Sequence, residues 1–242
     1  MGLLSKMILA LVIVVLLGVV ALGYLGFVPG LSDVMGSNKP RDLGITYTAS
    51  DLNSANSKLG VTIKTLPPTE NGIDSLSRSG QQQVTASFTS AELTALFNDH
   101  SQKWKYYPIK DIQVKIGDDG TIEMSGVLLV NRFKGLADAL EIPEGGRSQI
   151  RPYLSYVSSN PSIYIKGRLS VANNVVQSDI TEIQIGRFSV GGDQLQGIQP
   201  VIEQFIQDRA DGRIIHINSA SFSNGKANID VLIPQEVGLT PP

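Results

Sequence analysis

The chain has 242 residues, a formal net charge of −2 at neutral pH, 17% charged residues and no cysteine. The absence of cysteine excludes a disulfide-stapled scaffold and a thiol nucleophile. Because the sequence contains no basic tract, it also argues against a nucleic-acid partner.

The first 28 residues differ from the rest of the chain because they are almost wholly apolar. The stretch from Met7 to Val28 has 22 residues and no charge. As a helix it would be about 33 Å long, enough for a hydrocarbon core of about 30 Å. We therefore predict that residues 1–28 form a single transmembrane helix, an uncleaved signal anchor. A cleaved secretory signal peptide is the alternative, since Ala21-Leu22-Gly23 is a small-x-small site.

This predicted anchor also sets the expected localisation and domain organisation. A short N-terminal flank favours export of the remaining chain, so we expect a single-pass protein of the cell membrane with an extracytoplasmic C-terminal domain. Residues 29–46 contain Gly, Pro, Ser and Asn without a sustained period, which is typical of a linker. Residues 47–242 are then one extracytoplasmic domain. No Asn-x-Ser/Thr sequon occurs, which favours a prokaryotic cell envelope.

Two stretches share one sequence pattern, "YTASDLNSAN" and later "FTSAELTALFN". Thr48 with Asp51, and Thr89 with Glu92, have the spacing of a capping box. In this motif a hydroxyl and an acid three residues apart each accept a hydrogen bond from the other's backbone amide. The pattern therefore predicts two helix starts and implies no ligand. The predicted helices cover about residues 51–59 and 90–101.

Alternating apolar residues predict three β-hairpins in the second half of the chain. In the first, a strand around Val114 returns through a strand around Met124 across the turn "GDDG". The second hairpin turns near Asn173-Asn174. The third turns at Asn224-Gly225, a dipeptide that strongly favours hairpin turns.

Further elements precede and separate the hairpins. Period-two alternation predicts strands in "VTIKTL" and "QQVTASF", whereas "PPTENGIDSLSRSG" is typical of a loop. Amphipathic spacing predicts helices within residues 135–140, 147–159 and 193–212. Because hairpins are antiparallel and each has one apolar face, the sequence predicts an α+β fold: a curved antiparallel sheet of hairpins packed with amphipathic helices.

Patterns that carry catalysis or bind metals are missing from the sequence. There is no Gly-x-Ser-x-Gly elbow, no P-loop and no Gly-x-Gly-x-x-Gly after a strand. His100 and His216 have no further ligands at metal-binding spacing, and the dispersed carboxylates form no acid and base pair that the sequence can establish. We therefore expect no enzyme activity, no metal and no cofactor.

The motif "WKYYP", from Trp104 to Pro108, holds the single tryptophan of the chain. Trp and Tyr suit a membrane interface or the rim of an apolar pocket. A connection between a helix and a strand also often places such rings in the core, and we favour this packing role. The candidate ligand-binding residues are Phe97, Trp104, Tyr106, Tyr107, Met124 and Leu128.

The order of these elements resembles a known group of proteins. The phrases "FTSAELTALFN", "VKIGDDGTIEMSGVLLV", "GRLSVANNVVQSDITEIQIGRFSV" and "HINSASFSNGKANIDVLIP" resemble the YpmS-like anchored extracytoplasmic proteins of bacteria. These in turn look like TULIP-like tubular lipid-binding folds. The resemblance covers about residues 88–234, and residues 41–83 have no counterpart in it. It implies a curved sheet, a helix along it and an apolar groove that binds a lipid.

Two functions are compatible with these observations. The first is a membrane-anchored, non-catalytic binding module for a lipid or another apolar ligand, because an apolar groove suits acyl chains. The alternative is a cell-envelope scaffold whose polar surface docks another membrane or envelope protein. Alternating apolar residues predict one oily face in both cases, so periodicity alone leaves both functions open.

Overall fold

A computed structural model gives the fold of most of the chain. The described residues are 3–25, 28, 30–142, 144–145, 147–148, 160–192, 195–197, 199–200, 203 and 215–242, and side chains in the first helix are described from residue 13 onward. The helices predicted within residues 147–159 and 193–212 therefore fall mostly outside the described residues.

The prediction of a transmembrane helix is wrong. Helix α1 spans Leu3–Leu25, and among the described residues no helix combines the length and the apolar character that crossing a membrane requires. The predicted signal anchor, single-pass topology and extracytoplasmic localisation at the cell membrane depended on this helix and are corrected with it.

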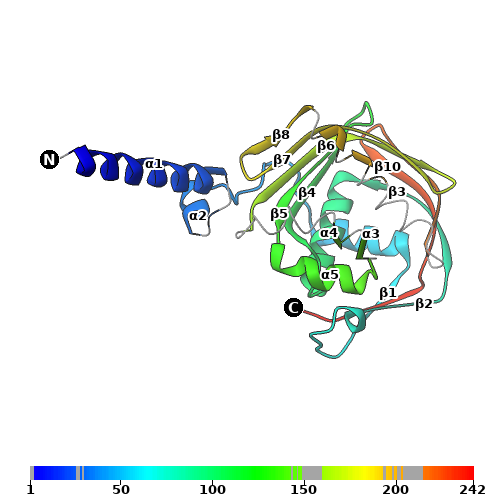
Figure 1. The fold of residues 1–242 in the computed structure, drawn as a ribbon. Helices are drawn as coiled ribbons and strands as arrows, with labels where there is room; N and C mark the ends of the chain where they lie inside the picture. Colours follow the sequence, from blue (N-terminus) through cyan, green and yellow to red (C-terminus); the bar gives the residue numbers. More distant parts are fainter. Residues whose placement is uncertain are drawn as a thin grey trace.

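Within the described part of the chain, the large sheet contains eight strands (Figure 1). Strand β6 (Ser162–Ala172) pairs along its whole length with β7 (Val175–Ile185). The other edge of β6 pairs first with β5 (Ile122–Leu128) and, at its far end, with β9 (His216–Ser223). The other strands of this sheet are β3 (Gln82–Thr89), β4 (Ile109–Ile116), β8 (Phe188–Val190) and β10 (Lys226–Ile233).

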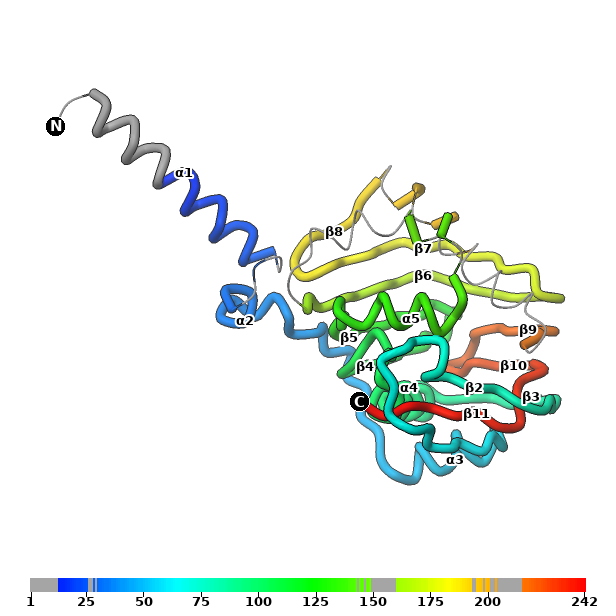
Figure 2. Tube along the Cα trace, turned by 60° about the horizontal axis from the view of Figure 1, so that its bottom comes forward, coloured from blue at the N-terminus to red at the C-terminus, as the bar shows by residue number. Residues whose placement is uncertain are grey.

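This pairing bends the sheet into half of a barrel. The strand order is β3-β10-β9-β6-β5-β4, with β7 and β8 continuing from the other edge of β6. Figures 1 and 2 show the strands curving around the helices. All pairs in this sheet are antiparallel, and the three hairpins lie where the sequence places them. The predicted α+β fold with a curved antiparallel sheet is therefore confirmed.

A second, smaller sheet joins the two ends of the domain. Strand β11 (Glu236–Leu239) lies between β1 (Thr62–Thr65), to which it is parallel, and β2 (Leu76–Ser79), to which it is antiparallel. Strand β2 lies in the stretch predicted as a loop, and that prediction is corrected here. The short strand forms because its backbone finds a partner more than 150 residues away in sequence, at Glu236–Leu239.

Both predicted capping boxes are confirmed. In front of α4, the Thr89 amide donates to Oε2 of Glu92 (2.9 Å) and the Glu92 amide donates to the Thr89 hydroxyl oxygen (3.2 Å). Thr48 and Asp51 form the same pair of bonds in front of α3. The remaining helices are short. Helix bounds are α2 (Leu31–Met35), α3 (Ala49–Leu59), α4 (Ser90–Lys103), α5 (Phe133–Ala139), η1 (Ile73–Ser75) and η2 (Val130–Arg132).

Helix α4 closes the edge of strand β4 with its side chains. Asn98 donates to the carbonyl oxygen of Ile112 (2.7 Å) and accepts from the Ile112 amide (3.0 Å). The hydroxyl of Thr94 accepts from the amide of Val114 (3.0 Å) and donates to its carbonyl oxygen (3.3 Å). Since both helical side chains are buried, they replace a neighbouring strand and satisfy backbone groups that burial would otherwise leave unpaired.

Side chains also form hydrogen bonds with the strand backbone further along β4 and on β7. One turn before Thr94, the hydroxyl of Ser90 accepts from the amide of Ile116 (3.0 Å). On β7, Glu203 accepts from the amide of Ser178 (3.2 Å), and Gln199 donates to the carbonyl oxygen of Ser178 (2.8 Å). Edge strands covered in this way present fewer free groups to another chain.

Candidate functional site

The predicted aromatic residues Trp104 and Tyr106 are packed into the interior, where they are 7% and 9% exposed. The Trp104 ring nitrogen donates to the Ser75 hydroxyl (3.2 Å), and the Tyr106 hydroxyl donates to the carbonyl oxygen of Glu70 (2.9 Å). Gly135 of α5 lies directly against the Tyr106 ring. Both rings therefore have the satisfied polar ends that buried Trp and Tyr normally have.

The other four candidate residues lie in the same region or in the main core. Tyr107 meets Trp104 edge to face, with ring centroids 6.3 Å apart, and burial raises the pKa of Tyr107 to about 12. Phe97 and Met124 are half-buried and pack against the core beneath α4, while Leu128 ends β5. Tyr107 packs against both apolar clusters, the one that holds Trp104 and Tyr106 and the one against which Phe97 and Met124 pack. None of the six residues lines the pocket described below.

The concave face of the sheet carries a continuous row of apolar side chains. Val114 pairs with Met124, Met124 with Ile165, Ile165 with Ile183, and Ile183 with Val190. The row therefore crosses five strands, from β4 to β8. Among the described helices, α4 packs against β4 at one end of this row. A single uninterrupted apolar row suits either a core or an elongated apolar ligand.

The next residues along the same strands form a polar row on the opposite, convex face. Gln113 lies beside Ser125, Ser125 beside Tyr164, and Tyr164 beside Gln184. This alternation follows from the two-residue period of a strand. The polar row is where the N-terminal part of the chain crosses the sheet.

We call residues 36–45 the strap, because they run across the convex face from β7 to β4. At the β4 end, the amides of Leu43 and Ile45 both donate to Oε1 of Gln113, at 2.8 and 3.3 Å. Leu43 is 8% exposed. The whole strap lies within residues 29–46, predicted as a linker, and hydrogen bonds join it to β4, β6 and β7.

Arg41 holds the middle of the strap. Its guanidinium carbon lies 3.5 Å from the centre of the Tyr164 ring, and its Nη2 donates to Oε1 of Glu182 (2.9 Å) and of Gln184 (3.0 Å). The Tyr164 hydroxyl donates to Oε2 of Glu123 (2.6 Å). Burial, reinforced by this bond to Glu123, raises the pKa of Tyr164 to about 12, so Tyr164 is neutral at physiological pH.

The end of the strap near β7 is joined to α1 and α2. The Ser37 hydroxyl donates to the carbonyl oxygen of Tyr24 (2.6 Å), and the Arg187 amide donates to that of Leu25 (3.2 Å). Nη2 of Arg187 donates to the carbonyl oxygen of Met35 (2.6 Å). These donors satisfy carbonyl groups that the ends of α1 and α2 leave open, and a cation near a helix C-terminus is favourable.

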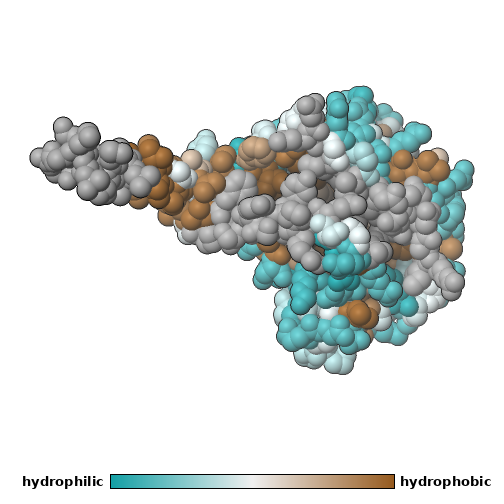
Figure 3. Space-filling model, viewed as in Figure 1, coloured by the Kyte–Doolittle hydropathy of each residue, from teal (hydrophilic) through white to brown (hydrophobic). Residues whose placement is uncertain are grey.

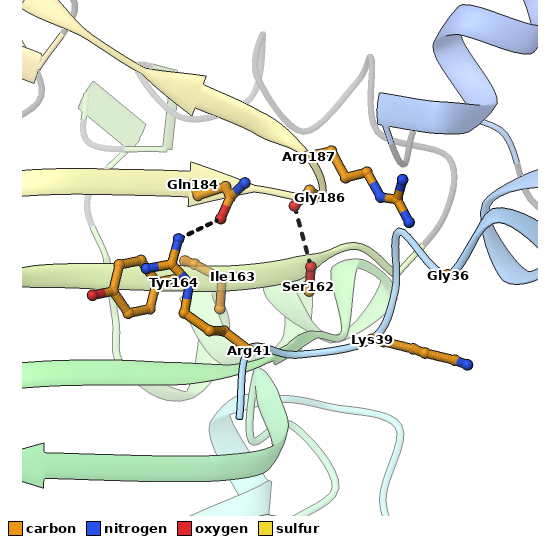
Figure 4. A pocket seen from close by; sticks show the side chains of 9 residues that line it. All are labelled: Gly36, Lys39, Arg41, Ser162, Ile163, Tyr164, Gln184, Gly186 and Arg187. Carbon is orange, nitrogen blue, oxygen red and sulfur yellow. Dashed lines mark hydrogen bonds between the residues drawn. The ribbon is translucent and has the colours of Figure 1, made fainter. Parts of the chain in front are cut away.

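A pocket of about 240 Å³ opens between the strap and the sheet (Figure 4). Its walls come from the strap on one side and from β6, β7 and the turn after β7 on the other. The lining residues are Gly36, Lys39, Arg41, Ser162, Ile163, Tyr164, Gln184, Gly186 and Arg187. Three of these carry positive charge, and none is acidic.

The two histidines lie apart from this pocket. Burial lowers the pKa of His100 on α4, and Nδ1 of His216 lies 2.6 Å from the side-chain nitrogen of Asn174. Within the part of the chain that the structure describes, no three His, Cys, Asp or Glu side chains converge as metal ligands would.

Comparisons with protein-family models, with curated proteins and with solved structures found no match. The class of the protein is therefore defined by its geometry: an α+β half-barrel whose convex face is crossed by a strap that encloses a polar pocket. The resemblance to TULIP-like folds stays a prediction.

Sequence reasoning missed the pocket because its residues come from three separate stretches. Arg41 lies in a stretch without periodicity, where a single Arg carries no signal. Tyr164 and Gln184 are the polar positions of alternating strands, and such positions normally face solvent. Only the crossing of the strap over these strands turns them into a pocket wall.

Proposed function

We propose that the protein is a non-catalytic binding module that holds an apolar ligand against the concave face of its curved sheet. The observation that carries this proposal is the apolar row from Val114 to Val190. Helix α4 packs against the β4 end of the row, and Leu195 packs against the buried Ile183 and Val190 toward its other end. The other end is formed by β6, β7 and β8.

The energetics favour such a ligand. Each buried methylene group of a ligand contributes about 0.8 kcal/mol, so an acyl chain that follows the row would be bound firmly even without polar contacts. The resemblance of residues 88–234 to lipid-binding folds implies the same kind of ligand. Helix α1 contributes no residue to the apolar row, so its role does not affect ligand binding there.

The test is to purify the full chain and to analyse organic extracts by mass spectrometry, with thermal unfolding in the presence of added oleate as a second measurement. We expect a co-purifying apolar molecule and a rise in Tm, because a ligand that binds only the folded state stabilises it. A chain that carries no apolar molecule and is not stabilised by oleate contradicts the proposal.

A pair of variants localises the ligand. Ile165→Trp adds volume on β6 within the apolar row, whereas Ile229→Trp adds the same volume on β10, beside the core beneath α4. We expect Ile165→Trp to lower the amount of bound ligand per folded protein. Ile229→Trp should instead lower the free energy of unfolding, since overpacking a filled core is destabilising.

A second candidate function, docking of another protein, is supported by α1. Its side chains from Ile13 to Tyr24 include many large apolar groups that are exposed, such as Val14 at 64% and Leu17 at 63%, and Figure 3 shows them as a brown band. Contiguous exposed apolar surface often marks an interaction site. A photocrosslinking residue at Leu17 should capture one stoichiometric protein partner, and the same residue at the exposed Val34 of α2 should not.

A further inference from the structure

We propose that the pocket between the strap and the sheet binds a small phosphate-type oxyanion. This site is on the convex face, so it is independent of the apolar site proposed for the concave face. Its volume of about 240 Å³ is below the roughly 300–1,000 Å³ of sites for drug-sized ligands. The pocket therefore suits a phosphate group with at most a small substituent.

Charge is the first argument for an anion. Lys39, Arg41 and Arg187 line the pocket, and no carboxylate is among its lining residues. Near Gly36, the stem of Lys39 and Nη2 of Arg187 come close together: a Cβ atom added to this glycine would lie 3.5 Å from Cδ of Lys39 and 3.8 Å from Nη2 of Arg187. Positive charges gathered around one partly enclosed site raise the local concentration of anions.

Hydrogen-bonding capacity is the second argument. Each guanidinium has five N–H donors, and the bonds that Arg41 and Arg187 form with other described side chains and carbonyl groups all use Nη2. Donors on Nε and Nη1 therefore stay available to a ligand. Planar guanidinium groups bind phosphate oxygens with two parallel bonds, which makes Arg a preferred phosphate ligand.

The shape of the pocket is the third argument. The strap holds Arg41 over the Tyr164 ring, while Arg187 is fixed by its bond to the carbonyl oxygen of Met35. Both cations are thus positioned before any ligand arrives, which lowers the entropic cost of binding. Figure 4 shows Lys39 extending from the strap toward solvent, so its flexible stem can swing over a bound anion.

The test is calorimetric titration of the full chain with sodium phosphate, at pH 7 and at constant ionic strength set with sodium chloride. We expect saturable binding at one site. Lys39→Gln removes an exposed ammonium and should leave the fold intact, yet it should weaken phosphate binding about tenfold. The matched control is Lys226→Gln in the β9–β10 hairpin. Lys226 is also exposed, and its replacement should leave the affinity unchanged.

Two variants of Arg187 distinguish the effect of its charge on phosphate binding from an effect on the fold. Arg187→Lys keeps the charge and Arg187→Gln removes it, so we expect binding to fall further in the second variant when both have the Tm of the parent chain. If Arg187→Gln does not fold, the comparison of Lys39→Gln with Lys226→Gln decides the question. Absence of saturable binding by the parent chain, or equal weakening by the two lysine variants, would overturn the proposal.

A titration with glycerol phosphate identifies the ligand further. Tighter binding of this monoester than of inorganic phosphate would assign the extra volume of the pocket to a small organic substituent. Equal affinities would assign the site to free phosphate. In both cases, the Lys39→Gln variant should bind the preferred anion more weakly than the parent chain does. If it binds that anion equally well, the anion is not held in this pocket.

Discussion

The ammonium nitrogen of Lys58 lies 2.6 Å from Oε1 and 2.7 Å from Oε2 of Glu92, and this ion pair links helix α3 to helix α4. The Glu92 side chain is only 7% exposed. It also accepts from the Ser54 hydroxyl (2.5 Å) and from the Thr89 amide (2.9 Å). One buried carboxylate thus completes a capping box and joins two helices.

This arrangement makes stability depend on pH. Burial by itself raises the pKa of Glu92, but the bonds from Lys58, Ser54 and the Thr89 amide outweigh it and lower the pKa from 4.5 to about 2. Because the folded-state pKa is depressed, the contribution is fully present above about pH 4.5 and is lost as the pH falls toward 2. A shift of this size corresponds to about 3 kcal/mol.

We therefore expect Glu92→Gln to lower the free energy of unfolding by about 3 kcal/mol at pH 7. The difference from the parent chain should shrink steadily below pH 4.5, as measured by urea unfolding at several pH values. Glu236→Gln is the control, since Glu236 forms an exposed pair with Lys64 and should have a much smaller effect. A difference that does not change between pH 7 and pH 3 would contradict the assignment.

The edge of β4 gives a second prediction. Asn98→Ala removes both partners of the Ile112 backbone, leaving one amide and one carbonyl group buried without hydrogen bonds. We expect a loss of about 2–6 kcal/mol in the free energy of unfolding, because each of the two unsatisfied buried groups costs about 1–3 kcal/mol. Urea unfolding at pH 7 measures this loss.

Asn53→Ala supplies the matched control, since Asn53 is an exposed residue of α3. Its replacement should change the free energy of unfolding by less than about 0.5 kcal/mol. Similar losses in the two variants would mean that the side chain of Asn98 does not replace a strand.

The strap gives a third prediction. Arg41→Ala removes the contact with the Tyr164 ring and the bonds to Glu182 and Gln184. These contacts together contribute about 1–2 kcal/mol, so local opening of the strap should become about 5- to 30-fold more frequent. Hydrogen exchange at the amide of Leu43 reports this opening directly, because that amide is bonded to the sheet.

Arg168→Ala is the control for this variant. Arg168 also forms a pair with an acid, Asp119, but both side chains are 60% exposed and lie outside the strap. Its loss should leave the exchange rate of the Leu43 amide unchanged. Equal acceleration in both variants would show that Arg41 has no particular role in holding the strap.

Local signals in the sequence were sufficient for much of the fold. The capping boxes of Thr48 and Thr89 depend on residues three positions apart, and hairpin turns such as Asn224-Gly225 depend on two. Such features are decided by neighbours along the chain. The alternation of apolar and polar residues along each strand is also local, and it predicts that the sheet has one apolar and one polar face.

Features decided by distant partners could not be predicted. The strand β2 is four residues long and forms only because β11 lies beside it, and four residues show no reliable period. The strap has no period of its own because its hydrogen bonds are made with distant partners. These are Gln113 on β4, Ser162 on β6, and Glu182 and Gln184 on β7. The apolar run at the N-terminus predicted a membrane span that the described helices do not provide.

The packing of Tyr106 gives the last prediction, which distinguishes a filled interior from an open site around the aromatic cluster. A Cβ atom added to Gly135 of α5 would lie 2.1 Å from the Tyr106 ring, so Gly135→Ala forces the ring or the helix to move. We expect a loss of about 1–3 kcal/mol in the free energy of unfolding, with a change in the emission of the nearby Trp104, the single tryptophan of the chain. Gly197→Ala is the control: no atom of a described residue lies within 4 Å of the added Cβ, so replacing this helical glycine should stabilise the chain by up to about 1 kcal/mol. If Gly135→Ala is tolerated as well as Gly197→Ala, the ring has free space beside it, and the aromatic cluster regains its place as a candidate ligand site.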